Sequence, residues 1–177
     1  MLDGEHRIIK SAVRGEASAF GLLYDHYQPK IYRFVLIKVG QREDAEDLTH
    51  QVFINAWQNV YNYRSLGFPF SSWLYQIARN LVIDHYRTRK ADLPIHAIDP
   101  DSFATVASAH FSVEHAMDME RVTRAIQRLK AEYQDVILMR FVEELSLKET
   151  ARALEKSEGA VKLLQHRAVK ELKTLLA

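Results

Sequence analysis

Residues 147–172 read LKETARALEKSEGAVKLLQHRAVKEL, two short helical patterns separated by a tight turn. Ser146 and Glu149 form the S-x-x-E pattern of a capping box at the start of the first helix. Ser157 is placed to cap the second helix, and the small side chain of Ala151 lets two helices approach closely. The spacing predicts a helix-turn-helix, in which the second helix enters a major groove with its N-terminal residues leading.

The turn and the second helix raise two questions about this motif. Glu155 stands where such turns often have glycine, and a left-handed backbone there costs a residue with a side chain on the order of 1 kcal/mol. Leu163 and Leu164 are adjacent, so one should be core and the other should face DNA, where it could touch a thymine methyl group. Packing between the helices is expected from Leu147, Leu154, Val161, Leu164 and Ala168.

Positive charge is concentrated on the last helix. Residues 156–177 hold five basic and two acidic residues, a net charge of +3, whereas residues 113–155 hold seven basic and nine acidic residues, a net charge of −2. Because the whole chain carries only +1, a site for nucleic acid must depend on such local charge. The alternative interpretation is a scaffolding helical hairpin with a solvated basic face.

The remaining chain predicts an all-α protein of two small helical domains joined by a flexible linker. Residues 91–112 contain two prolines and no stable period, and they are too long for an ordinary loop, so we expect a linker between domains at 1–90 and 113–177. Ser71 or Ser72 should cap the helix that ends near Arg89, and Pro29 should kink the helix that ends at Gly40. Helices are expected at about 5–14, 16–39, 42–60, 71–89, 113–130, 132–143, 147–154 and 158–175.

Composition excludes several classes of site. The 177 residues include no cysteine, which rules out disulfides and thiolate chemistry and fits a reducing cytoplasm. No apolar run is long enough for a membrane span or a signal peptide, so we expect a cytoplasmic protein without membrane insertion. The eight histidines show no metal-ligand spacing, and no phosphate-binding loop or nucleophile constellation is present. We therefore expect no metal, no cofactor and no enzymatic activity.

An acidic helix start precedes an aromatic stretch in the first domain. Asp44, Asp47 and Gln51 share one helix face, which suits a basic partner surface, although carboxylates at a helix start also satisfy its dipole. Residues 57–75, WQNVYNYRSLGFPFSSWLY, hold seven of the eighteen aromatic residues. Trp57 and Trp73 fit a core, whereas Tyr61, Tyr63, Phe68 and Phe70 lie in or beside a loop where they could stack on unpaired bases.

A basic, amide-containing helix follows the aromatic loop. Residues 79–90 carry a net charge of +3. Asparagine can read base edges, and arginine binds phosphate or bases. The expected contacts to a melted strand on this helix are Arg79, Asn80, Asp84 and Arg87. The competing interpretation treats the whole aromatic stretch as core.

Two segments resemble a known family. The run DAEDLTHQVFINAW, followed by FSSWLYQIARNLVIDHYR, resembles region 2 of the extracytoplasmic-function (ECF) sigma factors of bacterial RNA polymerase. The run LSLKETARALEKSEGAVKLLQHRAVKEL is similar to their region 4. The resemblance covers residues 5–90 and 113–175, and it implies a protein that directs the core polymerase to promoters.

The resemblance also implies a role for each candidate residue. Asp44, Asp47 and Gln51 would dock on the β′ clamp helices of RNA polymerase, while the second domain would meet the β flap. The aromatic loop and Asn80 would melt the −10 element and capture a flipped base, and the linker would run near the RNA exit path. An anti-sigma factor would hold the protein inactive, in some systems at the membrane. The −35 element would be read by Ser157, Lys162, Leu163, His166 and Arg167.

One rival function survives alongside a sigma factor. A repressor or activator with a helix-turn-helix, acting without polymerase, explains residues 147–172. It leaves the acidic helix face and the aromatic loop unexplained. Binding to core polymerase, as opposed to duplex DNA alone, separates the two hypotheses.

Overall fold

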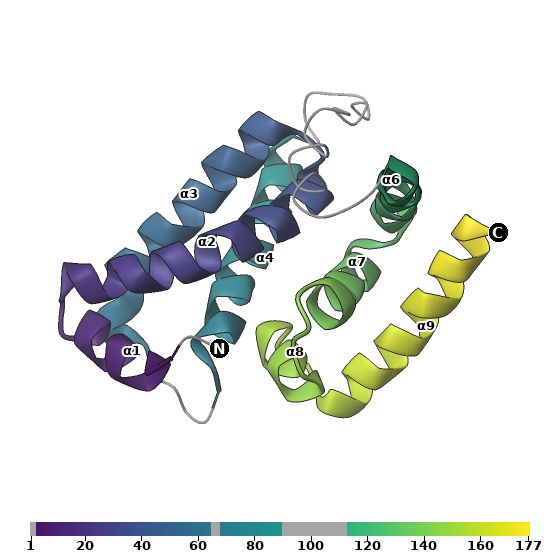
Figure 1. Cartoon of the computed structure of the whole chain (residues 1–177). Helices are drawn as coiled ribbons and strands as arrows, with labels where there is room; N and C mark the ends of the chain where they lie inside the picture. Colours follow the sequence, from purple (N-terminus) through teal and green to yellow (C-terminus); the bar gives the residue numbers. More distant parts are fainter. Residues whose placement is uncertain (1–2, 65–67, 90–112) are drawn as a thin grey trace.

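The computed structural model describes residues 3–64, 68–89 and 113–177, and within these ranges every regular element is helical. The expected linker at 91–112 lies outside the described residues. Figure 1 shows the helices as two groups that face each other. The elements are α1 (Glu5–Val13), α2 (Ala17–Val39), α3 (Arg42–Asn59), η1 (Val60–Asn62), α4 (Phe70–Arg89), α6 (Val113–Arg128), α7 (Ala131–Ile137), η2 (Leu138–Val142), α8 (Leu147–Ala153) and α9 (Glu158–Leu176).

The first group packs α2, α3 and α4 along one another, with α1 across one end (Figure 1). Leu23, Phe34, Val52 and Leu74 are fully buried between these helices. Each such side chain contributes roughly 1.5–3 kcal/mol through its removal from water. Helix α2 continues through Pro29 and ends at Gly40, whose φ of 73° is the left-handed C-terminal conformation that glycine favours.

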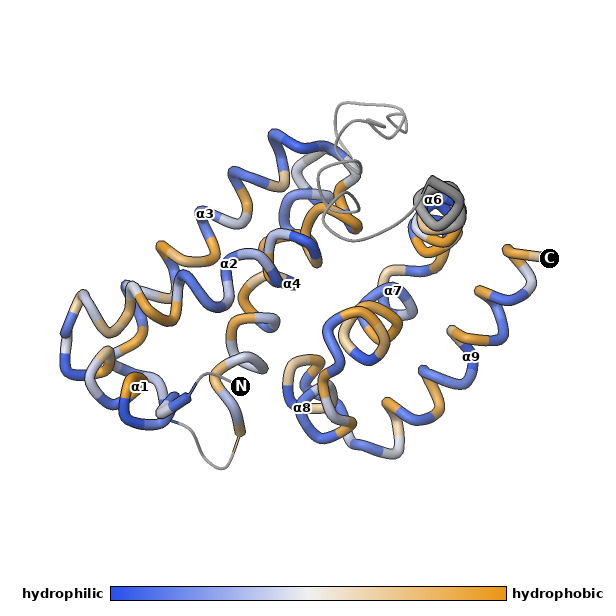
Figure 2. Tube along the Cα trace, viewed as in Figure 1, coloured by the Kyte–Doolittle hydropathy of each residue, from blue (hydrophilic) through white to orange (hydrophobic). Residues whose placement is uncertain are grey.

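The second group contains the predicted helix-turn-helix. The Ser146 hydroxyl accepts from the Glu149 backbone N–H, and the Glu149 carboxylate accepts from the Ser146 N–H, so the capping box is confirmed. Ser157 caps α9 by accepting from the Ala160 N–H. Glu155 has a φ of 54°, so the turn uses the left-handed conformation without a glycine. Figure 2 shows apolar and polar residues alternating along α9, as expected for an amphipathic helix.

Several local expectations were wrong. Helix α4 begins at Phe70, so Ser71 and Ser72 lie in its first turn and do not cap it. Ser72 is buried and donates its hydroxyl to the Glu149 carbonyl of α8 instead. Trp57, near the end of α3, packs on Phe20 of α2 but is 40% exposed. It is therefore less buried than the core residue that we expected. The helix expected at 132–143 is α7 followed by the π-helix η2.

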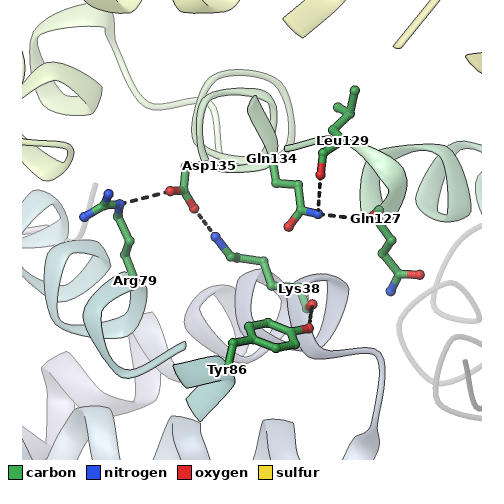
Figure 3. A network of polar contacts seen from close by, with 7 residues as sticks. All are labelled: Lys38, Arg79, Tyr86, Gln127, Leu129, Gln134 and Asp135. Atoms are coloured by element: carbon green, nitrogen blue, oxygen red, sulfur yellow. Dashed lines mark hydrogen bonds and ion pairs between the residues drawn. The ribbon is translucent and has the colours of Figure 1, made fainter. Parts of the chain in front are cut away.

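The two groups meet through α4 against α8 and through α2 against α6. This contact includes charged residues: Lys38 on α2 and Arg79 on α4 both pair with Asp135 on α7 (Figure 3). In the described part of the chain, each helix is too short or too polar for a bilayer-spanning segment.

Candidate nucleic-acid interface

An amide-lined cavity lies between α3, η1 and α4. Its volume is about 490 Å³, within the range of ligand-sized pockets. Asn80 and Asp84, both expected from the sequence, line it together with Tyr63. The remaining lining residues are Asn55, Asn59, Asn62, Trp73, Ile77 and Leu81.

The asparagines on α3 and η1 were missed by sequence reasoning. Asn55, Asn59 and Asn62 follow at spacings of four and three, which places them on one helical face. The Asn59 amide donates to the Asn55 carbonyl at 2.8 Å, and the Gln51 amide donates to the Asn55 side-chain oxygen at 2.7 Å. Each side-chain amide offers donors and an acceptor, the same groups that base edges use. The amide spacing is the signal that could have identified them.

An aromatic wall closes one side of the cavity. Tyr63 is half-buried, with its ring centroid 5.2 Å from that of Trp73, and its hydroxyl donates to the Phe68 carbonyl at 3.1 Å. Burial raises the pKa of Tyr63 to about 12, so the phenol, already neutral at physiological pH, stays neutral further into the alkaline range. A neutral aromatic wall beside amides can stack on a base without repelling its phosphates.

Phe70 does not belong to this wall. It is 1% exposed and packs against Tyr27, Tyr63 and Trp73 with ring centroids 5.9, 5.1 and 5.3 Å away. The expectation that Phe70 is an accessible loop aromatic was therefore wrong, because the start of α4 is anchored by this cluster. Tyr61, in contrast, is 64% exposed in η1.

The expected DNA-facing residues on α4 point to different surroundings. Arg79 does not line the cavity; its Nε donates to Asp135 at 2.9 Å. Arg87 is exposed and lies 3.5 Å from Asp84, one turn away on the same helix. The structure therefore brings Asn80 and Asp84 to the cavity, leaves Arg87 exposed beside Asp84, and directs Arg79 toward the second group of helices.

The expected polymerase-facing residues lie on one face of α3. Asp47 and Gln51 are exposed, as the acidic-face interpretation requires. Asp44 is partly buried, and one of its carboxylate oxygens lies 3.7 Å from the His85 Nε2 of α4. Asp44 therefore also contacts its own domain, so Asp47 is the better probe of this surface.

The N-terminal half of α9 presents an exposed row of side chains, three polar and one apolar. Lys162, Leu163, His166 and Arg167 are exposed, while Leu164 packs against the core with Val161 and Ala168. The Ser157 hydroxyl accepts from the Ala160 N–H and so caps α9. The helix N-terminus therefore lies beside this row. Among the described residues, no group of His, Cys, Asp or Glu is arranged to hold a metal ion.

Comparisons with known proteins match both groups of helices. The Sigma-70 region 2 family matches residues 23–91, and the Sigma-70, region 4 family matches residues 119–172. The chain is 31% identical over 180 residues to the ECF RNA polymerase sigma factor SigW of Bacillus subtilis, covering 95% of this chain and 94% of SigW. This chain belongs to the ECF sigma factors.

A second relative and one solved structure agree with this assignment. The ECF sigma factor is 38% identical over 170 residues to BldN of Streptomyces coelicolor, covering 96% of this chain and 64% of BldN. It thus spans less than two thirds of the length of that relative. Its fold is similar to that of RpoE from Bartonella quintana, solved with the anti-sigma factor NepR, with a TM-score of 0.74 at 20% identity over 89% of this chain and 96% of RpoE. These matches support a sigma factor, and they do not support a repressor acting without polymerase.

Proposed function

We propose that this ECF sigma factor directs core RNA polymerase to promoters by reading the −35 element with α9 and capturing a −10 base in the cavity beside α4. One observation carries the proposal: the amide-lined cavity and the exposed row on α9 occur in the two segments that match sigma regions 2 and 4. Residues 1–90, 91–112 and 113–177 are the corresponding domain, linker and domain. No catalytic step by this chain is part of the proposal.

The −10 mechanism is a competition between unstacking and capture. Extracting a base from a duplex costs a few kcal/mol, and stacking on an aromatic side chain returns about 1–3 kcal/mol per base. Tyr63 and Trp73 supply the stacking surface, and Asn80 supplies an edge contact that distinguishes one base from another. Arg87, which pairs with Asp84, and exposed Tyr61 contact the adjacent strand.

The −35 mechanism combines phosphate and base contacts. Lys162 and Arg167 bring positive charge to the phosphate backbone of the DNA. The N-terminus of α9, capped by Ser157, adds N–H groups of the protein backbone as donors to phosphate. Leu163 is an exposed apolar side chain on the same face, which suits a thymine methyl group. His166 is exposed in the same row and offers ring nitrogens for a phosphate or base-edge contact.

Three protein contacts complete the proposal. Asp47 and Gln51, with Asp44 beside them, form the surface for the β′ clamp helices, since exposed carboxylates and amides suit a basic partner. The second domain meets the β flap, and the linker follows the RNA exit path. An anti-sigma factor acts as the negative regulator, with the protein in the cytoplasm or held at a membrane through that partner.

The decisive test separates the base pocket from the polymerase contact. Core polymerase is loaded with wild-type protein, Asn80→Ala or Asp47→Arg, and promoter opening is followed by permanganate reactivity of thymines. Asn80→Ala should bind core polymerase normally and open promoters poorly, whereas Asp47→Arg should fail to bind. Normal opening by Asn80→Ala together with normal core binding by Asp47→Arg would contradict both assignments.

A further inference from the structure

Gly159 occupies a helical position where glycine has no local advantage. It is the second residue of α9. The left-handed glycines among the described residues are Gly4, Gly15 and Gly40. Gly159 therefore has a backbone conformation that any residue can adopt, and glycine is disfavoured in a helix because it loses more conformational freedom on folding than alanine does. The backbone of α9 does not explain this glycine.

Packing inside the chain does not require the glycine either. Gly159 is exposed, and a Cβ atom added to it would meet nothing within 4 Å beyond its chain neighbours and the adjoining helix backbone. In the free protein an alanine would therefore fit at this position without moving another residue. The missing side chain points to a contact that the free chain does not contain.

Gly159 stands at the head of the exposed row on α9. Lys162, Leu163 and His166 follow it at spacings of three, four and seven residues, so all four residues share one helical face. The three side chains of this face are exposed, Leu163 by 50%. Figure 1 shows this end of α9 beside α8, the first helix of the helix-turn-helix. The face that lacks a side chain is thus the face assigned to DNA.

A major groove leaves little room around a helix. The groove of B-form DNA is about 12 Å wide, and a helix with its side chains is about 10–12 Å across. The first residues of the second helix of a helix-turn-helix are those that contact base edges. A side chain on the facing side of the first turn would meet the DNA before the residues of the next turn do. Its absence lets the helix axis come closer.

We propose that Gly159 is a specificity-determining position of α9, whose missing side chain lets the first turn enter the major groove deeply enough for Lys162 and Leu163 to reach base edges. This role rests on the −35 function proposed above for α9. The free helix is less stable with glycine than with alanine at this position, whereas the complex with DNA is more stable. Gly159 therefore contributes to recognition by exposing the surface of its backbone.

The first measurement is the thermal stability of the full-length chain. Gly159→Ala should melt no lower than wild type, because neither the backbone nor the packing needs glycine. Gly21→Ala is the matched control: Gly21 lies inside α2, and a Cβ atom added to it would also meet nothing within 4 Å. It should melt roughly 1–4 °C higher than wild type. A melting temperature of Gly159→Ala below that of wild type would show that the fold requires the glycine, and would overturn its role in recognition.

The second measurement is promoter binding by core polymerase loaded with each variant. The probe is a duplex promoter fragment that the wild-type complex selects from fragmented genomic DNA. Gly159→Ala should weaken this binding at least about fivefold, the size of one lost base contact, and Gly159→Leu should weaken it further. Gly21→Ala should bind the fragment as wild type does, and all variants should bind core polymerase equally. Equal promoter affinity of Gly159→Leu and wild type would overturn the role of Gly159.

A double variant checks that Gly159 acts through the base contacts of the next turn. Leu163→Ala should weaken promoter binding in the wild-type background. It should have little further effect in the Gly159→Leu background, because Leu163 no longer reaches its base there. Fully additive losses would contradict this mechanism.

Lys162→Ala and Leu163→Ala distinguish failure of this role from failure of the proposed function. If neither variant changes promoter binding, α9 does not read the −35 element, and the proposed function and the role of Gly159 fail together. If both variants weaken binding while Gly159→Leu binds as wild type does, α9 reads the element and only the role of Gly159 is overturned.

Discussion

Leu163 and Leu164 are neighbours in α9 with different surroundings: Leu163 is 50% exposed, whereas Leu164 packs against the core between α9 and its neighbours. Leu164→Ala should lower the free energy of unfolding by about 2 kcal/mol, because it leaves a cavity. Leu163→Ala should leave the melting temperature unchanged and reduce discrimination at a thymine of the −35 element. Thermal unfolding and competition binding with single-base promoter variants check the pair.

The two basic residues of the exposed row on α9 should make promoter binding dependent on salt concentration. Lys162→Ala should weaken binding of the polymerase complex evenly across sequences and lower the salt slope by about 1 if it contacts phosphate. Arg167→Ala should do the same, or should relax preference at one base if it contacts a base edge. Lys173→Ala, exposed near the other end of the helix, serves as the control and should change neither quantity.

The cavity should be separable from the aromatic core. Asn80→Ala should keep wild-type stability and lose about 1–3 kcal/mol of preference at one −10 base, even on a template premelted by mismatches. Phe70→Ala should instead destabilise the protein by about 3–5 kcal/mol, because Phe70 is buried among three aromatic rings. Equal melting temperatures for Phe70→Ala and wild type would contradict the assignment of Phe70 to the core.

The acidic face of α3 should bind core polymerase. Asp47→Arg should weaken that binding at least tenfold, since like charges at a partner surface cost more than one kcal/mol. Asp25→Arg, an equal charge reversal at an exposed position of α2, provides the comparison. Affinity for core polymerase is measured by fluorescence anisotropy, and equal losses in both variants would remove the specific role of Asp47.

Buried tyrosines make the fold sensitive to alkaline pH. Burial raises the pKa of Tyr63 to about 12, and burial also raises the pKa of Tyr27 and of Tyr75. The unfolded chain releases these protons near the ordinary tyrosine pKa of 10.0, while the folded chain retains them. The stabilisation is therefore complete below about pH 10 and is lost as pH rises toward 12.

Tyrosinate absorbance and circular dichroism, recorded together, check the alkaline transition. Buried tyrosines should ionise only as helicity falls. Tyr63→Phe should flatten the loss of stability between pH 10 and 12, and Tyr61→Phe should leave it unchanged. Full ionisation of all eight tyrosines with helicity intact would contradict the burial of these side chains.

Local rules predicted several helix ends and the helix-turn-helix. A helix cap contacts backbone groups only a few residues away, so sequence spacing was enough to place the caps. These are the capping box of Ser146 with Glu149, the N-cap Ser157 and the C-cap Gly40. The fold class and the family followed from the same segments. The roles assigned to site residues stay predictions.

Tertiary contacts decided what sequence spacing did not. Phe70 looked like a loop residue because its burial depends on Tyr27, far away in the chain. Arg79 looked like a free DNA contact because its partner Asp135 lies 56 residues further along and in the other domain. The spacing of Asn55, Asn59 and Asn62 places them on one helical face, but only the packing of α3 against α4 shows that this face lines a cavity.

Run-off transcription with core polymerase on fragmented genomic DNA, with start sites mapped, tests the central claim most directly. A sigma factor that reads with α9 and melts with the cavity should give discrete starts downstream of one shared pair of −35 and −10 sequences. Leu163→Ala should alter the first sequence and Asn80→Ala the second. Site-specific binding to duplex DNA without polymerase, with no new starts when polymerase is added, would contradict the account.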